Sequence, residues 1–453
     1  MSSGVVDAEY KPSPYIKEND FVDSLFRPHT VISAAATLLA VFVLQYAFAG
    51  TYISHYGMAF LASTGVFLVF SAVFLPDSIL VRPHPVVWRI TLGIGILYMI
   101  LVTFLLFLTV GDGRKFFQLL DPALGVPLEE ALYATDCSIC SIKDLKKIWD
   151  ALFDEFVVAH TIGYWVKMLV LRDFWLVFAL SLGFEVIECT LQYWLENFKE
   201  CWWDHLILDA FGCNLLGMIV GMATLRYLNM KEYNWVKLHD IKGIKQKALR
   251  ITMQFTPRDW HIQNWTFFNS PSNTMQVIFV LGTILIQEAN IFLLKYLLWI
   301  PPAHPFVITR VCIFGLLAIP AVREFYRYFR QERGERRLGA ASWVCCLAVY
   351  IETAVIIKYG KQTEDFFKPF PTHVRYAWTI AAVSWTTWFV LRYWGHWRVA
   401  RHSVLRNLLS WIFFFIPVLA FLVMCIISTP GLEELSSAIE NLLTQVFRRT
   451  IGI

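Results

Sequence analysis

The stretch VWRITLGIGILYMILVTFLLFLTV, Val87–Val110, decides the fold class of this chain. It carries a single charged residue, Arg89, which lies close to its beginning. A helix needs about 20 mostly apolar residues to cross the hydrocarbon core of a bilayer. The stretch therefore predicts a transmembrane helix.

Similar apolar stretches recur along the whole chain, which is 57% hydrophobic and only 16% charged. Soluble domains contain about 45–50% apolar and about 25% charged residues. The other stretches that could span a bilayer are Thr30–Ala49, Gly57–Leu75, Phe174–Trp194, Leu206–Leu228, Met275–Ile300, Phe306–Val322, Ala340–Ile357, Tyr376–Leu391 and Leu405–Ile427, with Phe153–Leu171 as a weaker candidate. We predict an all-α, polytopic membrane protein with about ten transmembrane helices and additional amphipathic interfacial helices.

Polar segments flank the predicted membrane region. Residues 1–23 predict a mobile polar tail, 24–428 a single transmembrane catalytic domain, and 429–453 an amphipathic C-terminal tail. Ile241–Phe255 mixes basic and apolar residues, which fits either a helix on an anionic membrane surface or a solvated connecting helix.

The net charge of +4 is small, but the basic residues cluster in loops. Short loops rich in Lys and Arg stay on the cytoplasmic side of a membrane. With Phe153–Leu171 counted as a span, three such loops fall on one side, at Lys231–Arg250, Arg323–Arg337 and Arg398–Arg406. The hairpin around Glu196 then falls on the opposite side, towards the lumen or the exterior.

The most acidic segment of the chain reads FEVIECTLQYWLENFKECWWDHLILDAFGCN, Phe184–Asn214. Six carboxylates against one lysine leave a local charge of −5 with histidine neutral; they are Glu185, Glu188, Glu196, Glu200, Asp204 and Asp209. A charge at the centre of a transmembrane helix costs about 2.5–3.5 kcal/mol on insertion scales. Several such groups close together require protonation, basic partners or bound cations.

The spacing of these groups directs them to a common site. Residues three and four positions apart share one face of a helix. That spacing occurs at Glu185, Glu188 and Gln192, and again at Asn197, Glu200 and Asp204. Oxygen ligands without paired cysteines or an HExxH motif favour a hard cation such as Ca²⁺ or Mg²⁺. A proton or ion pathway and a purely structural polar network are the alternatives.

His160 is the candidate general base. Tyr164 and Lys167 follow it by one and two helical turns, on roughly the same face. A histidine near carboxylates and a cation can accept a proton at neutral pH. A lone histidine in an apolar helix can equally be a packing residue.

Two further polar features have simpler interpretations. Cys137 and Cys140 form one CxxC, but no second pair or suitably spaced histidines accompany it, so we expect a local disulfide or no special role rather than a zinc site. Arg310 lies within a predicted span, where buried charges seek partners, and Glu288 or Glu352 is the expected partner.

Several motifs resemble those of the base-exchange phosphatidylserine synthases, a eukaryotic family of endoplasmic-reticulum membrane enzymes. The similar motifs are RPHPVVWR (Arg82–Arg89), FEVIE (Phe184–Glu188), ENFKECWWDHLILD (Glu196–Asp209) followed by CN (Cys213–Asn214), QFTPRDW (Gln254–Trp260) and QEANIFLLK (Gln287–Lys295). The resemblance extends from about Asp23 to Tyr393. By contrast, the DGR at Asp112–Arg114 lacks the longer glycine and aspartate pattern of the CDP-alcohol phosphotransferases.

The resemblance implies Ca²⁺-dependent exchange of a phospholipid head group for L-serine. The implied partners are phosphatidylcholine and/or phosphatidylethanolamine, L-serine and membrane lipids, with a homodimer as a candidate assembly and no nucleic acid. The implied catalytic residues are His160, Asn197, Asp209 and Asn214, and the implied metal ligands are Glu185, Glu188, Glu200 and Asp204.

The resemblance in RPHPVVWR also implies a regulatory role for Arg82. The product phosphatidylserine is anionic, whereas the substrates are zwitterionic, so an arginine can distinguish them by charge. A membrane-interface arginine can also act only as a topology determinant or head-group anchor.

Physical reasoning agrees with the implied activity. Exchange of one phosphodiester for another is nearly energy-neutral, so no nucleotide-binding motif is needed. The rival function is a lipid or ion transporter with an acidic intramembrane site. Transporters often contain two related halves with paired broken helices, whereas the acidic segment occurs once.

Overall fold

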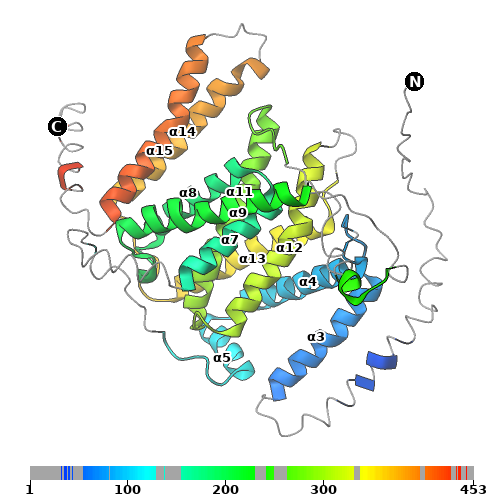
Figure 1. Cartoon of the computed structure of the whole chain (residues 1–453). Coiled ribbons are helices and arrows are strands. Elements are labelled where there is room, and N and C mark those ends of the chain that lie inside the picture. The colour runs from blue at the N-terminus through cyan, green and yellow to red at the C-terminus, as the bar shows by residue number, and fades with distance from the viewer. Residues whose placement is uncertain are drawn as a thin grey trace, which may run out of the picture.

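The computed structural model describes residues 55–80, 82–128, 137, 155–229, 241–248, 263–330, 337–397 and 404–429, with isolated residues near both ends of the chain. Within these ranges the regular structure is entirely helical (Figure 1). The elements are α3 (His55–Phe74), α4 (Pro85–Phe107), α5 (Val110–Leu120), α7 (Glu155–Leu171), α8 (Phe174–Leu191), η1 (Glu196–Phe198), η2 (Asp204–Cys213), α9 (Asn214–Asn229), α11 (Pro271–Leu298), α12 (Pro305–Arg330), α13 (Ala340–Gln362), α14 (Thr372–Trp397) and α15 (Val404–Ser428).

Eight of the described helical stretches are long and apolar enough to cross a membrane. They are Tyr56–Phe74, Pro85–Phe107, Phe174–Leu191, Ile207–Leu228, Pro271–Leu298, Pro305–Arg330, Ala340–Gln362 and Leu408–Ser428. Val157–Leu171 is a shorter apolar helix, and the expected span Tyr376–Leu391 lies within α14. The chain is thus an all-α, multi-pass membrane protein, as predicted. The expected first span, Thr30–Ala49, lies mostly outside the described residues, as do QFTPRDW and most of the two tails.

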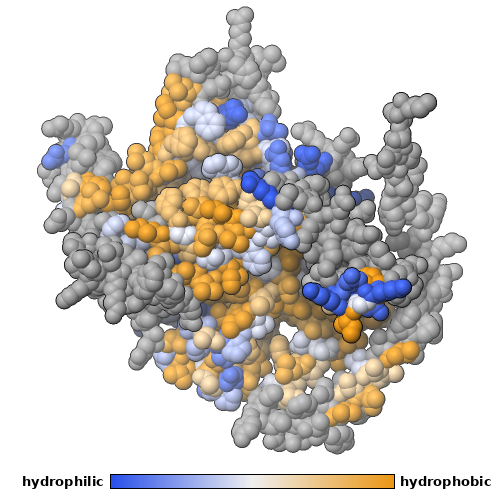
Figure 2. All heavy atoms as spheres, viewed as in Figure 1, coloured by the Kyte–Doolittle hydropathy of each residue, from blue (hydrophilic) through white to orange (hydrophobic). Residues whose placement is uncertain are grey.

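The outer surface of the helices suits lipid rather than water. Large apolar side chains such as Phe104, Trp175 and Leu422 are exposed, and apolar residues cover much of the described surface in Figure 2. An apolar exterior of this extent is expected for helices that contact acyl chains.

Local sequence signals explain where the helices begin. Asp173 caps α8, because its Oδ1 accepts hydrogen bonds from the backbone N–H groups of Trp175 and Leu176. Ser270 caps α11 in the same way, with Pro271 at the first helical position. These caps satisfy backbone donors that no residue within the helix can bond.

Helices α7, α8 and α9 surround the acidic segment. A two-residue turn, Arg172–Asp173, connects α7 to α8 and makes them antiparallel. α9 runs parallel to α7, and two glycines of α9, Gly217 and Gly221, allow the two backbones to approach closely. Small residues four apart are a common interface between membrane helices.

Two buried charges of the bundle, on α12 and α13, are paired with each other. Arg310 of α12 donates to both carboxylate oxygens of Glu352 on α13, at 2.7 and 2.6 Å. The expected pairing with Glu352 is therefore confirmed. Glu288 instead contacts Lys167 of α7, with 2.8 Å between Nζ and Oε1, so it does not serve Arg310.

One end of the bundle carries the acidic hairpin. Leu195 of that hairpin packs in a cluster with Leu105, Phe117, Leu298 and Tyr359, which come from the C-terminal ends of α4, α11 and α13 and from α5. α4 therefore begins at the opposite end, where α9 and α12 finish. The loops predicted to be basic depart from that opposite end, in agreement with the predicted orientation.

Candidate catalytic and metal centre

The acidic segment does not continue as one regular helix. α8 ends at Leu191, η1 is a single 3₁₀ turn, and Lys199 has an extended backbone conformation. The expected helical face through Asn197, Glu200 and Asp204 is therefore wrong as a local structure. The chain becomes helical again at Trp202, and from Asp204 to Cys213 it is a π-helix that continues into α9.

The π-helix matters because it changes which side chains face the site. Its i→i+5 bonding is visible where the Asn214 N–H donates to the Asp209 carbonyl. His205, Asp209 and Cys213, four residues apart in turn, are all buried and belong to the groups that could hold a metal ion. π-helical turns are frequently found at functional sites.

A first group of potential ligands lies between α8 and the start of η2. His205 Nδ1 is 3.0 Å from Glu185 Oε2 and 3.6 Å from Glu188 Oε2. All three side chains are at most 10% exposed. Two buried carboxylates and one imidazole thus lie close together and away from water. Negative charge on both carboxylates must therefore be neutralised by a proton or a cation.

A second group joins the hairpin to the same imidazole. Glu200, His205 and Asp209 bring ligand atoms within 4.8 Å of one another, with 3.7 Å between His205 Nδ1 and Glu200 Oε2. Burial and the charge of Glu188 raise the pKa of Glu200 well above its usual range. Burial and the charge of Asp209 raise the pKa of the nearby Asp204 to about 6. The site therefore concentrates negative charge that a cation can neutralise.

A third group surrounds the candidate base, His160 on α7. Its Nδ1 lies 3.2 Å from Asn214 Oδ1 and 3.7 Å from Asp209 Oδ1. Cys213 Sγ donates to that same Asp209 oxygen at 3.4 Å. α7 and the π-helix thus meet at one imidazole.

The hydrogen bonds of Asn214 determine the state of this imidazole. Asn214 Nδ2 donates to Ser181 Oγ at 3.0 Å and faces Glu185 Oε1 at 3.5 Å, so its amide oxygen must face His160. An amide oxygen only accepts, so Nδ1 of His160 carries the proton. In the neutral ring, Nε2 then keeps its lone pair and can accept a proton from a substrate.

The donor set fits a hard cation. Among the described residues, no hydrogen bond reaches the buried atoms Glu188 Oε2 and Asn197 Oδ1. Buried oxygens without a hydrogen bond are costly unless a ligand or water satisfies them. Carboxylate and amide oxygens suit Ca²⁺ or Mg²⁺, and His205 adds a nitrogen that the sequence prediction did not include.

The structure brings most of the predicted site residues together. The predicted residues that belong to one of the three groups are His160, Glu185, Glu188, Glu200 and Asp209. Asn214 contacts His160 and Glu185 through its side-chain amide. Asp204 lies close enough to interact electrostatically with Asp209 and Glu188. Arg82 lies at the start of α4, where its carbonyl oxygen accepts from Trp88 Nε1, and α4 packs against α3, α12 and α13.

Sequence reasoning missed three members of the centre. They are Ser181, His205 and Cys213. His205 could have been found, because a histidine directly after Asp204 in an acidic hairpin is a potential ligand. Ser181 and Cys213 carry no such signal, since both types are common in apolar helices.

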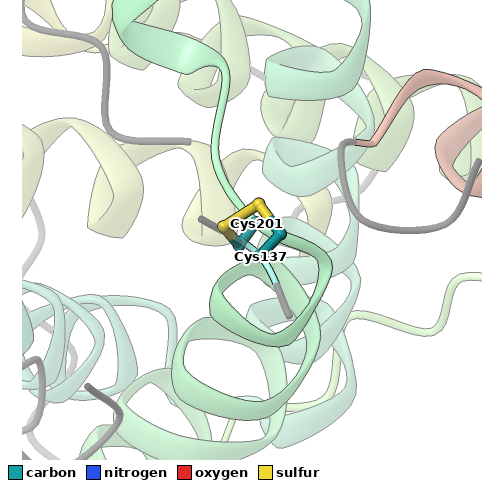
Figure 3. The surroundings of a disulfide bond; sticks show 2 residues. All are labelled: Cys137 and Cys201. Carbon is teal, nitrogen blue, oxygen red and sulfur yellow. A yellow bond between two sulfur atoms is a disulfide. The ribbon is translucent and has the colours of Figure 1, made fainter. Parts of the chain in front are cut away.

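The expectation of a local disulfide at Cys137 is also wrong. Cys137 is bonded to Cys201, 64 residues away, and Cys201 directly follows Glu200 in the hairpin (Figure 3). The partner of Cys137 is fixed by the tertiary fold rather than by the CxxC spacing. Cys140 lies outside the described residues.

The fold and this centre define a multi-pass membrane protein with a buried carboxylate–histidine site suited to phosphate chemistry. Residues 83–360 match the family model described as phosphatidyl serine synthase. The chain belongs to the phosphatidylserine synthase family and is an L-serine phosphatidyltransferase, which confirms the resemblance seen in the sequence.

Individual relatives support this assignment. The chain is 38% identical to phosphatidylserine synthase 2 of Homo sapiens, over 73% of this chain and 68% of that protein. It is also 38% identical to CDP-diacylglycerol–serine O-phosphatidyltransferase 2 of Oryza sativa, over 71% and 77%. The identity to phosphatidylserine synthase of Drosophila melanogaster is 33%, over 75% and 68%.

Proposed function

We propose that this phosphatidylserine synthase works by Ca²⁺-dependent base exchange, in which L-serine replaces the choline or ethanolamine of a phospholipid. The observation that carries the proposal is the contact between two sites. The imidazole of His160, with Nε2 available as a base, touches Asp209, and Asp209 also belongs to the carboxylate group around His205. A base and a candidate cation site therefore meet at one carboxylate.

In the proposed reaction, His160 Nε2 removes the proton from the serine hydroxyl as its oxygen attacks phosphorus. The bond to the choline or ethanolamine oxygen breaks, and the imidazolium returns the proton to this leaving oxygen. Asn214 and Asp209 hold the ring and stabilise its positive charge. The number and type of phosphodiester bonds are unchanged, so the exchange is nearly energy-neutral. It therefore requires no energy from a nucleotide.

Glu185, Glu188 and Glu200 are the proposed ligands of the cation, with Asp204 nearby. The proposal adds Asn197, whose amide oxygen is buried without a hydrogen bond. A bound Ca²⁺ would neutralise the phosphate and stabilise negative charge on its oxygens. The same excess of carboxylates would attract the cationic head group that leaves. His205 holds the carboxylates together or acts as an additional ligand.

CDP-diacylglycerol is a second candidate for the donor of the phosphatidyl group, because the name of the Oryza sativa relative refers to it. The absence of the CDP-alcohol phosphotransferase pattern in the sequence favours zwitterionic lipid instead. Purified protein should be supplied with labelled L-serine and one donor at a time: phosphatidylcholine, phosphatidylethanolamine or CDP-diacylglycerol. Equimolar release of choline or ethanolamine supports the proposal, and product formation with release of CMP from CDP-diacylglycerol alone would reject it.

We also propose that the protein resides in the endoplasmic reticulum with its site towards the lumen. The support is the disulfide next to Glu200, because disulfides persist in oxidising compartments. The hairpin lies opposite the loops predicted to be basic, which agrees with the positive-inside rule.

Arg82 is proposed as a sensor of the product, through the negative charge that phosphatidylserine carries and its substrates lack. Its place at the N-terminal end of α4, at the bundle end opposite the acidic hairpin, supports a regulatory rather than a catalytic role. A site at that end can bind product without occupying the catalytic centre.

A further inference from the structure

The Cys137–Cys201 disulfide joins two parts of the chain that carry the proposed centre. Cys201 lies in the hairpin between Glu200 and Asp204, whereas Cys137 precedes α7, the helix of His160. The loop that the disulfide closes therefore contains α7, α8 and the hairpin. Both cysteines are buried, at 8% and 3% exposure, against Trp203 and Leu208.

Cys201 also holds the beginning of the π-helix through its backbone. Its carbonyl oxygen accepts hydrogen bonds from the N–H groups of Asp204, at 3.0 Å, and His205, at 3.3 Å. Cys201 thus holds the first two residues of η2 through its carbonyl oxygen, and the disulfide to Cys137 holds Cys201.

The hairpin needs such a constraint because its own structure is irregular. Between the end of α8 and Cys201 its only helical structure is the 3₁₀ turn of η1, and the backbone at Lys199 is extended. Glu200 is the only member of the three ligand groups that lies in this irregular segment. The Glu200 carboxylate lies near the charge of Glu188, and the repulsion between these two carboxylates opposes this position of Glu200.

We propose that the Cys137–Cys201 disulfide is a positioning cross-link that holds Glu200 and the start of η2 at the cation site. This inference rests on the proposed cation-dependent function. Reduction by a phosphine or dithiol breaks the S–S bond, consumes two electrons and two protons, and leaves two thiols. The segment from Lys199 to Trp203 then loses its covalent link to Cys137, and Glu200 loses its fixed position.

The test uses purified full-length protein and measures serine incorporation against free Ca²⁺. The variants are Cys137→Ser, Cys201→Ser and the double variant, and the control is Cys312→Ser, which removes an exposed free thiol of α12. We expect loss of the disulfide to raise the half-maximal Ca²⁺ concentration roughly tenfold, as for removal of other supports of metal ligands. The maximal rate should recover at high Ca²⁺.

Chemical reduction keeps the inference testable if the serine variants do not fold. Folded wild-type protein should be treated with the phosphine reductant, with mass spectrometry of alkylated Cys137 and Cys201 to verify reduction. The same increase in half-maximal Ca²⁺ is expected for wild type and Cys312→Ser, because both proteins carry the Cys137–Cys201 disulfide.

The outcomes distinguish this inference from the function on which it rests. A lower melting temperature with unchanged Ca²⁺ dependence would show a merely structural disulfide and overturn the positioning role alone. Full activity of unreduced wild type in strong chelator would overturn the cation site itself, and the inference with it.

Discussion

Replacing Gly217 with alanine should separate the base from its supports without touching a polar group of the site. Gly217 lies on α9 one turn after Asn214, against α7 at Thr161, the residue after His160. A methyl group there would overlap the Thr161 carbonyl oxygen and lie 3.1 Å from the Trp165 backbone nitrogen. Backbone atoms cannot rotate away as a side chain can, so the helices must move apart.

The contacts of the added atom set the size of this movement. A Cβ atom at Gly217 would overlap the Thr161 carbonyl oxygen and lie 3.1 Å from Tyr164 Cβ, whereas carbon atoms pack at about 3.5–4.0 Å. A helix separation of roughly 1 Å follows. The same shift would stretch the 3.2 Å contact between His160 and Asn214 beyond hydrogen-bonding distance. A misplacement of about 1 Å can reduce a catalytic rate by about 100-fold.

The assay is incorporation of labelled L-serine into lipid by purified Gly217→Ala protein. Gly163→Ala on α7 is the matched control, because an added Cβ there has no neighbouring atom within 4 Å. Alanine favours a helix over glycine by about 1 kcal/mol, so neither variant should lose helix stability. A Gly217→Ala enzyme with the turnover of Gly163→Ala would refute the proposed coupling of α7 and α9.

Three further predictions concern single groups. His160→Ala should remain folded and inserted but lose about 100- to 10,000-fold in rate, the usual contribution of a general base, and near-normal turnover would exclude that role. The raised pKa of Asp204, about 6 because of burial, means that protons compete with the cation, so half-maximal Ca²⁺ should increase as the pH falls from 8 to 6; a constant value would argue against a ligand role. Arg82→Ala should retain basal exchange and show weaker inhibition by added phosphatidylserine, whereas superimposable inhibition curves would leave it a head-group anchor.

The sequence predicts the membrane helices well, because each span must satisfy the same requirement of length and apolar composition. Glu185 and Glu188 were predicted to share a face, and both reach His205 from α8. The pairing of Arg310 with Glu352 follows from the cost of leaving a charge unpaired in lipid.

Other features depend on tertiary structure that one sequence does not encode locally. The π-helix has no distinctive composition, so the turn that brings Asp209 to His160 was not foreseen. The contact of Lys167 with Glu288 joins residues 121 positions apart (288 minus 167). Likewise, the nearby Cys140 made a local disulfide the simplest interpretation of Cys137, although its partner is distant.

The central claim is that the carboxylate–histidine centre binds the cation that phosphatidylserine synthesis requires. The most direct measurement is the rate of serine incorporation as a function of free Ca²⁺ for wild type and Glu200→Gln, which keeps the shape of the side chain but removes its charge. The account predicts no activity in strong chelator, recovery with Ca²⁺, and a half-maximal Ca²⁺ concentration at least roughly tenfold higher for the variant. Identical Ca²⁺ curves for the two proteins, or full wild-type activity in chelator, would contradict it.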